Sequence, residues 1–277
     1  MRGRVGVCSW SLQPQTSGDL ARKVKTVGLS AVQLALDPLR VGEWNVAETV
    51  SMLQAAGIDV RSGMMRTRGE DYTTLESIKR TGGVRLDVFW DENLAAAGRN
   101  AQLARDLGID LVTFHAGFMP HERGDPVRQL MIDRLREIAD VFAANNVRIG
   151  LETGQETADT LLDALDQLDR PDVGVNFDPA NMILYGMGDP VEALRKLAPR
   201  VVQIHVKDAV GANTPGAWGS EVAVGGGEVD WTAFFAVARE AGLACDLMIE
   251  REAGGSRVGE IRHAHDLVER FINASGG

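Results

Sequence analysis

The stretch VVQIHVKD (residues 201–208) begins as a short apolar run and ends in side chains that bind ions or move protons. Its first residues, rich in valine and isoleucine, are typical of a strand that is buried on both faces. The run then finishes with His205, Lys207 and Asp208. One such ending says little by itself, but three other predicted strands of this chain end in the same way. A fold that brings these four strand endings together would explain the shared pattern.

Strand-like and helix-like runs alternate along almost the whole chain. Between the strands, apolar residues recur at i, i+3, i+4 and i+7, which is the spacing of one helix face. Eight strands alternating with helices favour parallel pairing and closure into a single (β/α)8 TIM barrel, an α/β fold. An open doubly wound sheet is the alternative, but its Gly-x-Gly-x-x-Gly turn does not follow the first strand. The predicted strands lie near Val5–Ser9, Ala31–Leu34, Val60–Met64, Leu111–His115, Arg148–Glu152, Val173–Asp178, Val201–Val206 and Asp246–Glu250.

Length and composition fit one barrel domain over residues 1–277. Hydrophobic residues make up 44% of the chain and charged residues 25%, and the net charge is −10. That charge argues against a nucleic-acid partner, because a basic footprint is needed to neutralise phosphates. No apolar run approaches the roughly 18 residues that cross a bilayer, and the N-terminus lacks a signal-peptide pattern, so we expect a cytoplasmic protein without a membrane partner. Cys8 and Cys245 are expected to be reduced, buried thiols.

Four successive predicted strands each place one metal-binding side chain at the same end. In a parallel barrel, the carboxyl ends of the strands meet at one face, where barrel enzymes have their active sites. Alternation along a strand also points His205 and Lys207 the same way. We therefore expect four side chains to converge over the barrel axis: Glu152, Asp178, His205 and Glu250.

Three carboxylates gathered in one place require a cation. Without one they would repel each other and take up protons. Three oxygen ligands and one imidazole suit Mn²⁺, Mg²⁺ or Co²⁺, and Zn²⁺ also accepts this ligand set. The sequence thus predicts one divalent metal ion and does not choose among these four.

The same four segments resemble the motifs of the xylose-isomerase-like barrels. They read LETGQET (151–157), VNFDPAN (175–181), QIHVKD (203–208) and MIERE (248–252). That superfamily includes ketose 3-epimerases, hydroxypyruvate isomerase, inosose dehydratase and abasic-site nucleases. The resemblance implies one divalent ion on the four matching residues. In the isomerases and epimerases it also implies that Glu152 and Glu250 handle protons on the bound sugar.

Two positions depart from the pattern of these relatives. Asn181 stands where several epimerases and the nucleases have a histidine, and Gln33 stands where many relatives have a glutamate. The nucleases' second metal-binding pair is also absent from the loop after the seventh strand, which argues against DNA repair. We expect Asn181 to hydrogen-bond a sugar hydroxyl and Gln33 to lie at a substrate-contact position.

Four further residues are predicted to bind substrate. His115 ends the fourth strand beside the expected metal and would contact substrate or serve as an additional ligand. Lys207 would stabilise an oxyanion or pair with a nearby acid. Glu156 follows Glu152 by about one helical turn, and Trp10 lies on a carboxyl-face loop where its ring could stack on a sugar.

These expectations together predict a metal-dependent isomerase or epimerase acting on a keto-sugar through a metal-stabilised enediolate, with Glu152 and Glu250 as acid and base. A lyase that expels a β-hydroxyl or a glycosidic oxygen is the alternative, either of the inosose dehydratase type or acting on keto-glycosides. A barrel that binds sugar without turning it over is the third. The expected partner is a small sugar, and since barrels of this kind often dimerise, a homodimer is a further expectation.

Overall fold

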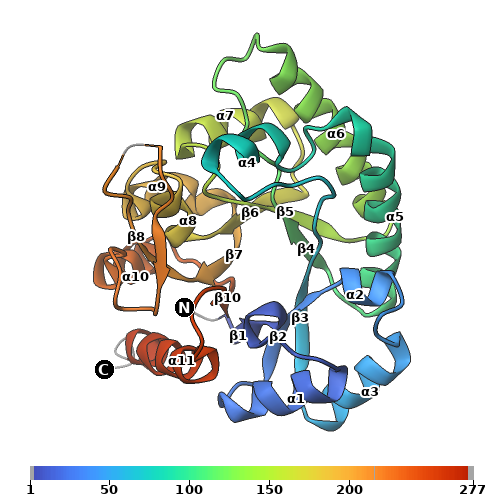
Figure 1. Cartoon of the computed structure of the whole chain (residues 1–277), viewed down its shortest axis with the longest axis vertical. Helices are drawn as coiled ribbons and strands as arrows, with labels where there is room; N and C mark the ends of the chain where they lie inside the picture. Colours follow the sequence, from blue (N-terminus) through green and yellow to red (C-terminus); the bar gives the residue numbers. More distant parts are fainter. Residues whose placement is uncertain (1–2, 215, 274–277) are drawn as a thin grey trace.

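The strands close into a barrel with all eight neighbours parallel. The structure is a computed structural model that describes residues 3–214 and 216–273. The strand order around the barrel is β1-β10-β7-β6-β5-β4-β3-β2, which confirms the predicted (β/α)8 fold, and the helices form an outer ring around it (Figure 1). The barrel strands are β1 (Val5–Cys8), β2 (Ala31–Ala35), β3 (Asp59–Met64), β4 (Leu111–Phe114), β5 (Arg148–Glu152), β6 (Val173–Phe177), β7 (Val201–Val206) and β10 (Asp246–Ile249).

The helices pack their apolar faces against the outside of the barrel. α1 shows how one strand connects to the next, because it ends just before Gly28, whose left-handed backbone (φ 80°) turns the chain into β2. None of the helices in the described part of the chain combines the length and the apolar character needed to cross a bilayer. They are α1 (Ser17–Thr26), α2 (Asp37–Arg40), α3 (Val46–Ala55), α4 (Leu75–Thr81), α5 (Trp90–Asp106), α6 (Pro126–Ala143), α7 (Ala158–Leu168), α8 (Pro179–Leu184), α9 (Pro190–Leu197), α10 (Trp231–Glu240) and α11 (Arg257–Asn273), with short 3-10 turns η1 (Ser9–Leu12), η2 (Asp87–Phe89) and η3 (Ala198–Arg200).

Two of the four predicted metal ligands lie one residue beyond their strands. Asp178 follows β6 and Glu250 follows β10. Asp178 is the N-cap of α8, and its side chain accepts a hydrogen bond from the Asn181 backbone N–H at 3.0 Å. The cap fixes this carboxylate at the point where strand becomes helix.

The glycine-rich segment after β7 is more ordered than its sequence predicts. β8 (Asp208–Val210) and β9 (Ser220–Val222) form a two-stranded antiparallel sheet. The buried Asp208 carboxylate accepts hydrogen bonds from the Gly225 backbone N–H at 2.8 Å and from the Trp231 indole N–H at 2.9 Å. Sequence periodicity missed this sheet because long-range contacts to one buried carboxylate organise it.

Candidate metal centre

The four predicted ligands meet at the carboxyl end of the barrel. They come from β5, β6, β7 and β10, all four are buried, and each offers one ligand atom that lies within 4.8 Å of the others. His205 is at the centre of the group. Its Nδ1 lies 3.4 Å from a Glu152 carboxylate oxygen, 3.4 Å from one of Glu250 and 3.7 Å from one of Asp178. The structure thus brings together every residue that the sequence assigned to the metal.

Two buried atoms in this group lack a hydrogen-bond partner among the described residues. They are Nδ1 of His205 and Oδ2 of Asp178, which face each other across 3.7 Å. Unpaired buried polar atoms are rare because each one costs free energy. An acceptor oxygen and an imidazole nitrogen left open toward two further carboxylates fit a divalent cation with oxygen and nitrogen ligands.

The charges of the site also call for a cation. Burial alone would lower the pKa of His205, but the carboxylates of Glu152 and Glu250 raise it well above its usual value. Burial raises the pKa of Asp178 to about 6. Both shifts favour protonation in a site that gathers three carboxylates, and a divalent metal ion would balance the same charge.

Residues beneath the site fix the orientation of the His205 ring. Its Nε2 lies 2.7 Å from Oε1 of Gln33, and the Gln33 amide nitrogen donates to the Thr113 hydroxyl at 2.8 Å. The second bond orients the amide so that its oxygen faces the ring. The Gln33 oxygen can accept a proton from Nε2, which the Asn176 amide nitrogen also contacts at 3.0 Å, and Nδ1 is directed toward the carboxylates.

Cys8 offers a second grouping with His205 and Glu250. Its sulfur lies 3.7 Å from Nε2 of His205, the nitrogen that Gln33 already holds. Burial also raises the pKa of the Cys8 thiol to about 12, so the sulfur keeps its proton. The three carboxylates with His205 are therefore the stronger ligand set. Both Cys8 and Cys245 are free thiols, as expected.

A cavity of about 790 Å³ opens above the ligands. Four of the predicted substrate contacts line it: Trp10, His115, Asn181 and Lys207. Asn181 donates to a Glu152 oxygen at 3.0 Å, and the Trp10 indole N–H donates to a Glu250 oxygen at 2.7 Å. Nε2 of His115 lies 3.6 Å from Glu152. Each of these side chains thus contacts one of the two glutamates as well as the cavity.

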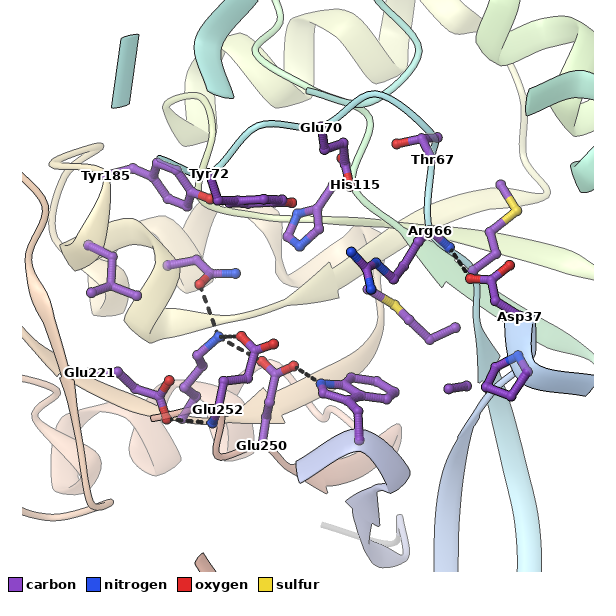
Figure 2. A pocket seen from close by; sticks show the side chains of 18 of the residues that line it. Asp37, Arg66, Thr67, Glu70, Tyr72, His115, Tyr185, Glu221, Glu250 and Glu252 are labelled. Atoms are coloured by element: carbon purple, nitrogen blue, oxygen red, sulfur yellow. Dashed lines mark hydrogen bonds and ion pairs between the residues drawn. The ribbon is translucent and has the colours of Figure 1, made fainter. Parts of the chain in front are cut away.

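Lys207 is a buried cation surrounded by acids, of which Figure 2 labels Glu250 and Glu252. Its ammonium lies 2.9 Å from Glu250, 2.9 Å from Glu252 and 3.8 Å from Asp178. Burial alone would lower the pKa of Lys207, but these carboxylates hold it well above its usual value. Burial would likewise raise the pKa of Glu250, yet Lys207 and His205 hold it well below its usual range. The pairing with an acid, one of the two predicted roles, is confirmed.

Two predicted substrate contacts do not line the cavity. Gln33 is fully buried inside the barrel. Instead of lining the cavity as predicted, it contacts His205, one of the four candidate metal ligands. Glu156 lies behind the barrel wall in an apolar pocket with Leu151 and Leu161, where burial raises its pKa to about 8. Its spacing from Glu152 suggested a shared face, but the segment between them forms bends rather than a helical turn.

Several cavity residues escaped the sequence reasoning. Arg66 and Tyr72 come from the segment after β3, Tyr185 follows α8, Glu221 lies in β9 and Glu252 follows β10. The rule that found the ligands could have found Arg66, because it follows the end of β3 by two residues. Tyr72, Tyr185 and Glu252 lie on irregular segments, where no periodicity assigns a direction to the side chain, and Glu221 lies on a strand that the sequence did not predict.

Comparison with known proteins places this geometry in a family. The model of the xylose isomerase-like TIM barrel matches residues 21–271. A solved structure titled as a xylose isomerase domain protein from Planctomyces limnophilus is 30% identical, covers 99% of this chain and 98% of its own, and superimposes with a TM-score of 0.87. An L-ribulose 3-epimerase (15% identical, TM-score 0.77, covering 98% of this chain and 95% of its own) shares the fold.

Two curated relatives match part of the chain. The 3-oxo-isoapionate decarboxylase of Pectobacterium atrosepticum is 29% identical over 120 residues, which are 43% of this chain and 42% of the relative. The 3-dehydroshikimate dehydratase of Bacillus anthracis is 33% identical over 90 residues, 31% of this chain and 32% of the relative. The matched segments thus span less than half of either relative. With the family model covering most of its length, this chain belongs to the xylose isomerase-like TIM barrel family.

Proposed function

We propose that this protein is a divalent-metal-dependent isomerase or epimerase of a keto-sugar or a close derivative. One observation carries the proposal. Two buried glutamates, Glu152 and Glu250, converge with His205 and Asp178 on one spot, and Glu250 lines the 790 Å³ cavity. A cavity of that size is within the range that encloses small organic ligands.

The two glutamates are prepared as proton carriers by different neighbours. Glu250 accepts hydrogen bonds from the Trp10 indole and the Lys207 ammonium, and Glu152 accepts from Asn181 and, at 3.3 Å, from Asn176. Burial would raise the pKa of Glu152, but His115 and His205 lower it. These neighbours favour the ionised form of both groups, which a base that removes a proton beside a carbonyl requires.

Glu152, Asp178, His205 and Glu250 would hold the metal ion. A divalent ion bound there supplies Lewis-acid polarisation of the substrate carbonyl, which makes the neighbouring C–H acidic enough for a carboxylate to remove its proton. Glu152 and Glu250 would then take a proton from one carbon and return one to the same or the adjacent carbon.

Lys207 favours a second candidate, a lyase. Its ammonium lies at the cavity surface within 3.4 Å of Asn181, and it can donate a proton to a departing oxygen. The two curated relatives are a decarboxylase and a dehydratase, reactions that break a bond next to the activated carbon. The solved L-ribulose 3-epimerase represents the other outcome. Both candidates share the first step.

Deuterium exchange tests that step and separates the candidates. Ketoses and keto-acids are incubated with the Mn²⁺-loaded protein in D₂O, and carbon-bound deuterium is followed by NMR. Deuterium in an unchanged or rearranged sugar supports the isomerase or epimerase, whereas an unsaturated, deoxy or decarboxylated product supports the lyase. Tight sugar binding without any exchange would instead indicate a barrel that binds sugar and overturn both.

A further inference from the structure

The cavity contains a cation that no acid among the described residues neutralises. The Arg66 guanidinium, on the segment after β3, forms neither a hydrogen bond nor an ion pair with any described residue. Figure 2 shows it pointing into the cavity, toward the space between His115 and Glu250. We propose that Arg66 binds an anionic group of the substrate, a carboxylate or a phosphate, at the end of the molecule away from the reacting carbonyl. This inference rests on the proposed function, because it assigns a class of substrate to the same cavity.

The acids that line the cavity are already engaged elsewhere. Asp37 pairs with Arg40 at 2.8 Å, and Glu221 pairs with Arg251 at 2.7 Å. Glu250 and Glu252 share Lys207. Glu70 accepts the Gly83 backbone N–H at 3.1 Å. The remaining lining acid, Glu43, is exposed at the rim and does not reach the guanidinium.

The base of Arg66 is anchored while its charged end is left open. Its backbone N–H donates to Oδ2 of Asp37 at 2.8 Å. The neighbouring Thr67 lines the same cavity, and its buried hydroxyl has no hydrogen-bond partner among the described residues. The exposed guanidinium of Arg66 is therefore the group of this segment that is available to an incoming acceptor.

A guanidinium suits this role better than the other cation of the cavity. Its planar donors match the oxygens of a carboxylate or phosphate, which they bind through two parallel hydrogen bonds. Lys207, in contrast, already neutralises two carboxylates. A neutral sugar would leave Arg66 without a counter-charge, so an anionic ligand gains an ion pair that a neutral one lacks.

The test compares ketoses that differ only at the terminal carbon. D-fructose, D-fructuronate and D-fructose 6-phosphate, together with the corresponding sets for other ketohexoses, are titrated into the Mn²⁺-loaded protein by calorimetry. The wild type should bind the carboxylate or the phosphate member of at least one set roughly 10-fold or more tightly than the neutral sugar, the effect of one charge-assisted contact. The preferred anion identifies which of the two groups the site takes.

The variants assign the preference to one residue. Arg66→Ala should remove it, Arg66→Lys should restore it in part, and Arg99→Ala, which deletes an exposed arginine on the outer helix α5, should leave it unchanged. Equal binding of neutral and anionic sugars, an unchanged preference in Arg66→Ala, or no binding by any anionic ketose would overturn the inference. If carbon–deuterium exchange were equally fast with neutral and anionic sugars, the inference about Arg66 would be overturned, and the proposed function would stand. Anion binding through Arg66 without exchange would instead refute the proposed function alone.

Discussion

The two sides of the cavity are built in opposite ways. On the side of β5, β6, β7 and β10, the functional groups are buried and tied to each other by short contacts. On the side of β1 to β4, the groups are Trp10, Arg66, Tyr72 and His115, which are half-buried or exposed. The first side is suited to chemistry because its groups are held in fixed positions. The side chains of the second side are more exposed, so they are open to contact with a substrate.

Two cations make the difference concrete. Lys207 is 3% exposed and lies against Glu250 and Glu252, so its charge is part of the folded structure. Arg66 is exposed to the cavity, and its guanidinium forms no ion pair with any described residue. A charge that the fold has already neutralised contributes to stability and to catalysis, whereas a charge left open is available to a ligand.

The largest expected effect is on the side of the ligands. Glu250→Gln removes a base but keeps an oxygen, and we expect carbon–deuterium exchange to fall by roughly 10²- to 10⁴-fold. Glu252→Gln is the matched control, because that carboxylate contacts the same Lys207 yet is largely in solvent. NMR of the exchanged sugar measures both variants. Comparable losses in the two would contradict the role given to Glu250.

The contrast between the two cations predicts a difference in stability. Lys207→Met leaves buried carboxylates without their counter-charge, and it should lower the free energy of unfolding of the metal-free protein by roughly 3–5 kcal/mol. Arg66→Ala removes an equal charge with no partner and should change it by no more than about 0.5 kcal/mol. Urea unfolding in the presence of EDTA checks both. Similar changes in the free energy of unfolding for the two variants would contradict the proposed difference between the two sides of the cavity.

A smaller effect is expected from the layer beneath the ligands. Gln33→Leu removes the acceptor of the Nε2 proton of His205, so the ring loses its fixed orientation. We expect the affinity for Mn²⁺ to fall by roughly 10- to 100-fold, the usual cost of losing such a contact. Calorimetric titration with Mn²⁺ measures it, and Gln33→Glu, which keeps the acceptor, is the control. Unchanged affinity in Gln33→Leu would show that the ring is held by other contacts.

The last expected effect concerns Glu156, a buried acid that forms no ion pair with any described residue. Its pKa is raised from 4.5 to about 8, so the folded chain keeps a proton that the unfolded chain loses. The free energy of unfolding of the wild type therefore declines between pH 5 and pH 8 through this group. Glu156→Gln should be more stable than the wild type at pH 8 by up to roughly 4 kcal/mol, and by less than about 1 kcal/mol at pH 5. Thermal unfolding at the two pH values checks this, and a difference independent of pH would contradict it.

The sequence by itself determined the barrel and the convergence of its four candidate metal ligands. Both follow from repeated local patterns, since parallel strands that end alike bring their endings to one face whatever lies between them. It also placed Lys207 beside the ligands, through alternation within one strand.

Only the tertiary structure decided the roles of Gln33, Glu156 and Arg66. Gln33 binds His205 from a strand 172 residues away in sequence, and Glu156 lies behind the wall because its segment bends. Arg66 differs from the many surface arginines of the chain in one respect, that it points into the cavity without an acid beside it. A partner, or the lack of one, depends on distances between segments remote in sequence, and local patterns do not encode those distances.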